Sequence, residues 1–369
     1  MASPPSSSSP ALRFDLDRLV AVDPGGHAGL RRLVAGDLDA LVELYRRRAS
    51  WMADMGIEQW REDDAARLRE HFARRLAAGG GLGLDGPEGR LASALLLDTE
   101  SALWDAWPHP WPEPVAYLEK LMADPAAPAG TGAAFLASAE TALAGAGLGL
   151  LRMDCIAASR PLRRFWQGRG YLPRGVRPYH DGTPVMLHEK RLGPLPGDHD
   201  HAVLAADALD GPFPGAIPAT LLFVVRDGRV LLIHKKRGHG AGNINGPGGK
   251  CDPGESPRAC AVREVAEELH IDVAAPEYRG ELRWIGTGGF HIHGFAYVST
   301  DFTGTPTETA EARPEWFDLD AVPYERMWAD DLMWLPWVLE GEGVRAAFLS
   351  HEDRIEAAHL EWGAGPEPE

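Results

Sequence analysis

Residues 246–271 have the sequence GPGGKCDPGESPRACAVREVAEELHI, a glycine-rich loop followed by a helical pattern. Ser256 suits an N-cap and Pro257 suits the first helical position, so a helix is predicted from there to about Leu269. Within it, three glutamates at positions i, i+3 and i+4 place their carboxylates about 5–6 Å apart on one face. Like charges at this spacing lower helix stability, and no nearby lysine relieves them. These glutamates are Glu264, Glu267 and Glu268.

Two interpretations of this acidic face are open from the residues alone. Acidic helical turns are common on protein surfaces, so the face can simply be solvated. Alternatively, a divalent cation removes the repulsion, because Mg²⁺ prefers a few carboxylates together with water and a substrate phosphate. The preceding loop, Gly246–Lys250, lets the backbone approach a phosphate or a metal closely, although a glycine-rich loop alone is more often only a turn. Together, the loop and the helix favour the metal site.

The spacing of loop and helix residues is more specific than either part. It is Gly249-x5-Glu255-x7-Arg263-Glu264-Val265-x-Glu267-Glu268-x-His270-Ile271, which resembles the signature of the Nudix hydrolase family. The resemblance implies an α/β/α sandwich that hydrolyses a nucleoside diphosphate linked to another group. Mg²⁺, or Mn²⁺ as an alternative ion, would activate the attacking water. His270 departs from the signature, because the family has glycine there, where a left-handed conformation is usual.

The same resemblance implies roles for individual residues. Either a ligand carboxylate or Glu311 is expected to act as the base, and Glu311 is also a candidate ligand. Arg263 and Glu255 are expected to support the loop through a salt bridge. The expected metal ligands are the carbonyl of Gly248 and the side chains of Glu264, Glu267 and Glu268.

A second resemblance, from about Thr220 to the C-terminus, concerns the substrate. Several stretches are similar to oxidised purine nucleoside triphosphatases of the MutT-homologue type, which hydrolyse 8-oxo-dGTP and related nucleotides to the monophosphate and pyrophosphate. This implies a role in sanitising the nucleotide pool. The stretches are Lys235–Gly238, Gly240–Gly242, Asn245-Gly246, Arg313–Phe317 and Met327–Asp331. The expected nucleotide-binding residues are Thr220, Lys235, Asn245, Gly248 and Gly249, with Trp328 stacking on the base and Asp330 and Asp331 binding its edge.

The adjacent aspartates Asp330 and Asp331 also have a physical interpretation. Two carboxyls in an apolar pocket cannot both ionise cheaply, so one keeps its proton and the pair can both donate to and accept from a purine edge. The alternative is that they favour the N-terminus of a helix over 332–339. His239 and Pro247 differ from the aromatic residues that relatives have near the base, which leaves the preferred base open. ADP-ribose and dinucleoside polyphosphates are alternative substrates within the family.

The first half of the chain, residues 28–193, resembles the GNAT acyltransferase superfamily. Gly130 and Gly132 open a predicted helix at which the family binds the pyrophosphate of acetyl-CoA on backbone amides. Ala127 departs from the basic or amide residue expected in that loop, and Trp166 from a tyrosine that acts as an acid in many members. Three interpretations are open: an acetyltransferase of unknown acceptor, a ligand-binding module without turnover, and a structural partner. An acetyltransferase regulated by a nucleotide-sensing Nudix half is a further alternative.

These features predict two α/β domains. We expect a flexible N-terminal segment over 1–27, a GNAT-like domain over 28–193, a Pro/Gly-rich linker over 194–216 and a Nudix domain over 217–365. Asp227-Gly228 between two apolar runs predicts a tight hairpin, since both residues suit positive φ. The other expected helices are 37–48, with Asp37 as its cap, 63–77, 132–144 and 161–167. The other expected strands are 91–97, 150–156, 220–225, 229–234, 282–285, 291–298 and 315–318.

Composition limits the class of protein. The 369 residues carry 37 basic and 54 acidic side chains, a net charge of −17, which argues against binding to duplex DNA. No apolar run approaches the ~18–20 residues that span a bilayer, so no membrane partner is expected. Three cysteines without metal-binding spacing suit a reducing cytoplasm. The expected partner is therefore a small-molecule nucleotide, and the oligomeric state is open.

Overall fold

The computed structural model describes residues 29–57, 60–61, 64–105, 113–193, 209–286, 291–351 and 354–368. The predicted N-terminal segment over 1–27 and most of the predicted linker, 194–208, lie outside these residues. The chain divides into two compact units, Met1–Leu162 with Val176–Pro194, and Arg163–Gly175 with Leu195–Glu369. Within the described residues, no helix is long and apolar enough to cross a membrane. The predicted α/β fold class is confirmed.

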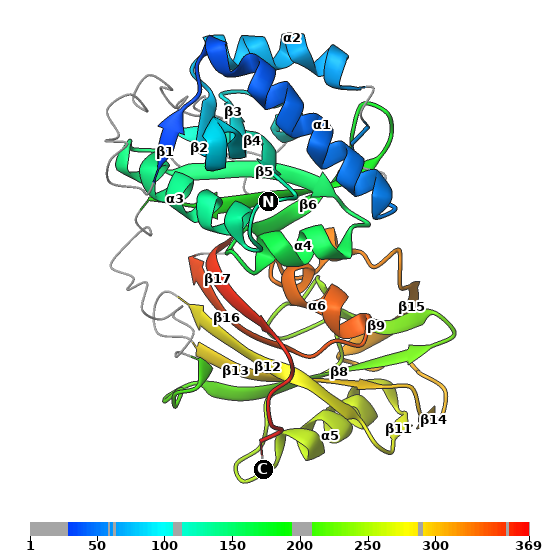
Figure 1. The fold of residues 1–369 in the computed structure, drawn as a ribbon. Coiled ribbons are helices and arrows are strands. Elements are labelled where there is room, and N and C mark those ends of the chain that lie inside the picture. The colour runs from blue at the N-terminus through cyan, green and yellow to red at the C-terminus, as the bar shows by residue number, and fades with distance from the viewer. Residues whose placement is uncertain are drawn as a thin grey trace. The chain divides into compact units, whose positions relative to one another are not determined.

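A seven-stranded sheet of order β1-β2-β3-β4-β5-β7-β6 forms the centre of the N-terminal fold (Figure 1). Neighbouring strands from β1 to β4 are antiparallel, whereas β4 and β5 run parallel and pair only between Val115–Leu118 and Leu150–Met153. The helices α1 and α2 pack on this sheet through apolar side chains such as Leu44, Tyr45 and Phe72. The strands are β1 Leu30–Arg32, β2 Gly81–Asp85, β3 Leu91–Asp98, β4 Val115–Ala123, β5 Leu150–Ile156, β6 Leu172–Pro178 and β7 Pro184–Arg191, and the helices are α1 Leu38–Asp54, α2 Asp64–Ala77, α3 Thr131–Gly145 and α4 Arg160–Gln167.

The first helix corrects one prediction. Asp37 stands at the N-cap position of α1, but its side chain makes no capping hydrogen bond. Its carboxylate instead accepts the backbone N–H of Val34 at 2.7 Å and pairs with the Arg31 guanidinium at 2.9 Å. A short 3-10 turn, Ala35–Asp37, precedes the helix and turns this side chain back along the chain. A guanidinium and a closer N–H therefore compete with the helix for the carboxylate.

The second unit contains a larger sheet with the order β10-β9-β8-β13-β12-β16-β17, and β15 pairs with the other side of the hairpin strand β9. Two of its pairings, β8 with β13 and β12 with β16, are parallel. A separate pair, β11 with β14, lies beyond the helix α5. The strands are β8 Ile217–Arg226, β9 Arg229–Lys235, β10 Ile244–Asn245, β11 Asp272–Val273, β12 Glu277–Gly286, β13 His291–Ser299, β14 Phe302–Thr303, β15 Ala312–Asp318, β16 Val344–His351 and β17 Arg354–Trp362, and the helices are α5 Pro257–Leu269 and α6 Asp331–Leu339.

The two helices cover opposite faces of this sheet (Figure 1). Because successive strand residues point to opposite faces, Leu222 and Val224 pack with α5, whereas Phe223 between them packs with α6. Phe223 meets the ring of Trp334 edge-on, with centroids 5.8 Å apart. The second unit is thus the α/β/α sandwich that the sequence predicts.

The predicted hairpin is confirmed, with φ of 53° at Asp227 and 72° at Gly228 between β8 and β9. At the start of the unit, Leu209 is buried with Ile285 and Leu349. This end of the predicted linker segment is therefore part of the second unit's core.

Candidate active site

The helix α5 carries the acidic face, and local interactions define both of its ends. The Ser256 hydroxyl accepts the backbone N–H of Ala259 at 3.3 Å, which satisfies one of the unpaired first-turn donors. At the other end, His270 adopts the left-handed conformation, with φ 56° and ψ 39°. Its Nδ1 lies 2.8 Å from the Thr307 hydroxyl. The histidine therefore takes the conformation for which the family signature has glycine, and its ring makes a hydrogen bond there that glycine lacks.

Two glycines let the preceding loop lie close to the sheet and the helix. A Cβ at Gly248, where φ is +152°, would lie 2.0 Å from the carbonyl oxygen of Thr220. A Cβ at Gly249 would lie 2.4 Å from a carboxylate oxygen of Glu264. The Gly248 N–H donates to Glu268 Oε2 at 3.0 Å. The loop therefore holds its backbone directly against two of the three glutamates.

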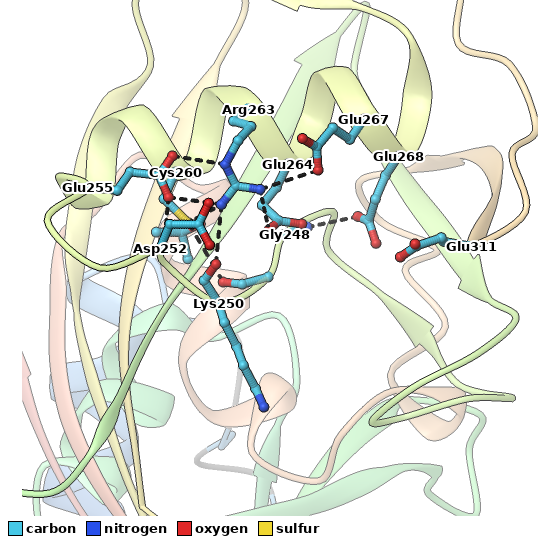
Figure 2. Close-up of polar contacts among 12 residues, drawn as sticks. Gly248, Lys250, Asp252, Glu255, Cys260, Arg263, Glu264, Glu267, Glu268 and Glu311 are labelled. Carbon is cyan, nitrogen blue, oxygen red and sulfur yellow. Dashed lines mark hydrogen bonds and ion pairs between the residues drawn. The ribbon is translucent and has the colours of Figure 1, made fainter.

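Arg263 organises the other charges of the acidic face (Figure 2). Its guanidinium donates to both carboxylate oxygens of Glu255, at 2.9 and 2.8 Å, which is the predicted salt bridge. The same group contacts Glu264 at 2.8 Å and Glu267 at 3.2 Å. The Arg263 hydrogen bonds and the N–H of Asp252 lower the pKa of Glu255 to about 2. Arg263 therefore neutralises part of the repulsion expected among the glutamates.

The three glutamates of the face differ in environment. Glu268 is 2% exposed, and its Oε1 lies 3.4 Å from the Lys235 ammonium. Burial raises the pKa of Glu268 and of Glu264, whereas the side chain of Glu267 is 62% exposed. Because Arg263 holds two of them, no three acidic, histidine or cysteine side chains in the described part of the chain surround a common point.

The donor set nevertheless fits a hard divalent cation. All of its atoms are carboxylate or carbonyl oxygens, the ligands that Mg²⁺ prefers. Gly249 leaves the space beside the Glu264 carboxylate that a side chain would fill. Glu311, which precedes β15, points toward Glu268 (Figure 2) and forms an ion pair with Arg237. The predicted ligands and the candidate base are thus close in space.

A second group of carboxyls lies at the N-terminus of α6. Asp330 and Asp331 are both 5% exposed. Oδ2 of Asp330 accepts two indole N–H groups, from Trp284 at 2.7 Å and from Trp334 at 3.1 Å, while Oδ2 of Asp331 accepts the backbone N–H of Trp328 at 3.1 Å. Burial raises the pKa of both carboxyls, and the Asp330 charge raises that of Asp331 further. The indole N–H groups oppose the shift at Asp330, so the geometry favours the proton on Asp331.

Sequence reasoning missed both indoles. Trp334 was detectable, because it stands four positions after Asp330 and therefore one helical turn away. Trp284 is 46 positions away on β12, so only the sheet register places it beside Asp330.

The other predicted nucleotide-binding residues are distributed around this region. The Trp328 ring stacks on His239, with centroids 4.9 Å apart and an angle of 22° between the planes. Asn245 lies on β10 beside β9. The buried hydroxyl of Thr220 lies 3.3 Å from the Cys260 sulfur, beneath α5.

In the first unit, the predicted acetyl-CoA residues lie at the start of α3. Gly130 is the N-cap residue and has a φ of 87°, which favours glycine. A Cβ at Gly132 would gain a contact of 3.1 Å with Ala123 on β4. Trp166 is buried and packs edge-on against Tyr171, with centroids 4.9 Å apart. An indole stands in the core where the superfamily pattern has an acid.

The fold and the loop–helix site together correspond to one class of protein. The model of the NUDIX domain matches residues 216–338. The chain belongs to the Nudix hydrolase family.

Individual relatives are more specific. The oxidized purine nucleoside triphosphate hydrolase of Danio rerio is 44% identical over 122 residues, which cover 33% of this chain and 78% of that protein. The corresponding protein of Mus musculus is 41% identical over the same length and with the same coverage. The NAD-capped RNA hydrolase NudC of Pseudomonas aeruginosa is 32% identical over 130 residues, 34% of this chain and 45% of that protein.

Solved structures match each half of the chain. The MutT protein of Bacillus halodurans has a TM-score of 0.36 and 29% identity, covering 39% of this chain and 97% of its own. A GNAT-family acetyltransferase of Listeria monocytogenes has a TM-score of 0.37 and 20% identity, covering 44% of this chain and 93% of its own.

Proposed function

We propose that the second unit, over residues 217–365, hydrolyses oxidised purine nucleoside triphosphates of the 8-oxo-dGTP type to the monophosphate and pyrophosphate in the presence of Mg²⁺ or Mn²⁺. The observation that carries the proposal is the buried pair Asp330 and Asp331, in which one carboxyl is bound by two indoles and the other is not. A purine edge that offers both a donor and an acceptor needs such a pair of unequal carboxyls. The similarity to two oxidized purine nucleoside triphosphate hydrolases supports this choice of substrate.

The side chains divide the work of the reaction. Glu264, Glu267, Glu268 and the Gly248 carbonyl would hold the cation, which neutralises phosphate charge and lowers the pKa of a bound water. Arg263 holds Glu255 against the loop and so keeps the backbone of Gly248 and Gly249 in place for the phosphates. Either Glu311 or a ligand carboxylate accepts the proton of the attacking water.

At the base, Asp330 accepts and Asp331 donates. Trp328 provides the stacking face, and Thr220, Lys235 and Asn245 lie on the strands behind the nucleotide. A wrong base leaves a buried carboxyl unpaired, which costs about 1–3 kcal/mol. This difference sets the expected preference for oxidised purines over ordinary ones. Such an enzyme would remove damaged nucleotides from the precursor pool, and its three cysteines suit a reducing compartment such as the cytoplasm.

For the first half, residues 28–193, a second function is proposed: binding of acetyl-CoA through its pyrophosphate. The specific observation is the left-handed Gly130 at the start of α3, which turns the chain so that the first helical amides are presented to an anion. Heat or a thermal shift on titration with acetyl-CoA tests this, and the absence of both leaves a structural role. Turnover requires an acid other than Trp166, since indole is not one.

A nucleotide panel tests the main proposal. Oxidised and ordinary purine triphosphates, ADP-ribose and a dinucleoside polyphosphate are incubated with Mg²⁺, and pyrophosphate and phosphate are measured separately. We expect pyrophosphate from the oxidised purines, with activity lost in EDTA and restored by Mg²⁺. Faster cleavage of ADP-ribose or of the dinucleoside polyphosphate would contradict the substrate assignment.

The variant Glu268→Gln tests the metal ligands. We expect kcat to fall at least about 100-fold, because cation binding contributes several kcal/mol and each 1.36 kcal/mol is tenfold in rate. Glu277→Gln, at the exposed start of β12, is the matched control and should keep full activity. A fully active Glu268→Gln variant would place the metal site elsewhere.

A further inference from the structure

Two cysteine side chains meet beneath the glycine-rich loop. Cys251 directly follows the loop, and its backbone N–H donates to the Pro218 carbonyl at 3.0 Å. Cys260 is fully buried in the first turns of α5. The two thiols lie within hydrogen-bonding distance of each other. One cysteine therefore belongs to the loop and the other to the helix that carries the acidic face.

The surroundings of Cys260 connect this pair to the site. Its sulfur lies 3.9 Å from the carbonyl oxygen of Gly249 and 3.6 Å from Nη2 of Arg263. Neither thiol takes part in the proposed hydrolysis. The third cysteine, Cys155, lies on β5 in the other unit, where its sulfur is 3.9 Å from His188 Nδ1. It provides a natural comparison within the same chain.

Two other occupants of this position are less suitable. A thiophilic metal needs more ligands than two thiols, and the described residues contain no group of three suitable side chains. Simple packing does not require two thiols to meet, since a single small thiol fills such a space. All three cysteines lie within the described residues and none forms a disulfide.

We propose that Cys251 and Cys260 are a peroxide-sensitive pair that forms a reversible disulfide between the loop and α5. Hydrogen peroxide first oxidises the more accessible Cys251: a sulfur–oxygen bond forms, the peroxide O–O bond breaks, and one water leaves. The Cys260 sulfur then attacks the resulting sulfenic acid, so that the S–S bond forms, the S–O bond breaks, and a second water leaves. In total two thiols lose two hydrogens to one peroxide.

The environment of the thiols affects the rate of this chemistry. Burial raises the pKa of both thiols, that of Cys260 to about 12, so few thiolates exist at neutral pH. The pair therefore reacts slowly with trace oxidant and forms the disulfide only under sustained peroxide, faster as the pH rises.

The disulfide also changes the site. A disulfide bond is about 2.05 Å long, much shorter than a thiol–thiol hydrogen bond, so its formation draws Cys251 toward α5. The preceding Gly249 then moves against the Glu264 carboxylate, where a Cβ has no space. Oxidation is expected to lower hydrolysis at least about tenfold and reversibly. This consequence alone rests on the proposed function, whereas the disulfide itself does not.

The experiment uses the full chain. Protein treated with hydrogen peroxide is blocked with N-ethylmaleimide under denaturing conditions, its adducts are counted by intact mass, and cross-linked peptides are mapped. We expect three adducts before oxidation and one afterwards, with Cys251 joined to Cys260, and three again after dithiothreitol. In Cys155→Ser the cross-link should persist, and in Cys251→Ser it should disappear while hydrolysis by the reduced protein is retained.

Each result has a definite meaning. Irreversible oxidation of Cys251 alone, or a cross-link that involves Cys155, overturns the proposal. A cross-link that leaves hydrolysis unchanged overturns the regulatory part. If no nucleotide is hydrolysed even in the reduced protein, the substrate proposal fails while the adduct count still decides whether the pair forms.

Discussion

Asp330 and Asp331 show how identical neighbours acquire different chemistry. Both carboxyls are buried, but two indole N–H groups bind the first and only one backbone N–H binds the second. Hydrogen bonds to a carboxylate favour its charged form, so the shared proton is held on Asp331. The pair therefore offers one acceptor and one donor on the side of a bound base.

This arrangement predicts a pH dependence. Since the pKa of Asp331 is raised well above its usual value, kcat/KM for an oxidised purine should fall as the pH rises and the pair loses its proton. Asp331→Asn keeps a donor that does not titrate, so its profile should lose this fall. Asp330→Asn removes the charged acceptor and should lower kcat/KM about 10- to 100-fold, as expected for 1–3 kcal/mol. Rates measured across pH for the three proteins check this, and identical profiles would refute the assignment.

At the scale of single residues, the spacing of Glu264, Glu267 and Glu268 was enough to predict which residues form the acidic face. It did not predict that Arg263 holds two of them, because an i, i+4 contact and an i, i+1 contact compete with metal binding only once rotamers are known. The support of Asp330 by Trp284 depends on the sheet register, which a single sequence does not specify.

Among the elements, α5 was predicted with the correct bounds because its signals are local. Ser256, Pro257 and the left-handed His270 define its ends without help from distant residues. The hairpin β16–β17 and the strand β4 were not predicted. Their partners β12, β3 and β5 are far away in the chain, and sheet pairing across long separations leaves only weak local signals.

The cap of α5 gives a stability prediction. Ser256→Ala removes the acceptor for the Ala259 N–H and should destabilise the protein by about 1 kcal/mol. Ser256→Asp supplies another acceptor at the same position and should retain most of the stability. Denaturant unfolding of both variants measures the difference. Equal losses in the two would show that the cap does not matter.

The loop gives a prediction about the metal. Gly249→Ala places a methyl group 2.4 Å from the Glu264 carboxylate, so this carboxylate must move. We expect the Mg²⁺ concentration for half-maximal activity to rise at least about tenfold, with little change in unfolding. Gly145→Ala, at the end of α3 where a Cβ meets nothing within 4 Å, is the control. An unchanged Mg²⁺ requirement in Gly249→Ala would mean that Glu264 does not bind the ion.

At the scale of the whole molecule, each unit contains a carboxylate that ion pairs keep charged at low pH. Although burial opposes it, hydrogen bonds from His71 and Arg75 lower the pKa of Glu119 to about 2 in the first unit, and Arg263 lowers that of Glu255 to about 2 in the second. Their stabilising contribution is present above the unfolded pKa of about 4.3 and is lost as the pH falls toward 2. Carboxyls whose folded pKa is raised act in the opposite sense, because they bind protons more readily when folded. They are Asp154, Glu264, Glu268, Asp330 and Asp331.

The balance predicts a melting temperature that rises as the pH is lowered from 8 toward 5 and then falls below about pH 4.5. Calorimetry across this range measures it. Glu119→Gln should weaken the fall on the acid side, whereas Glu70→Gln, at a side chain 85% exposed on α2, should not. A melting temperature that rises steadily to pH 3 would contradict the role of the ion pairs.

The contacts of Arg263 have a consequence for the life of the protein between encounters with a cation. Its guanidinium serves as a resident counterion for Glu255, Glu264 and Glu267, so the acidic turn is tolerated before any ion arrives. An incoming ion must displace this resident instead of filling an unscreened negative hole, and the gain on binding is correspondingly smaller. The ion is thereby held loosely enough to be exchanged, so occupancy follows the ambient supply and no dedicated loading step is required.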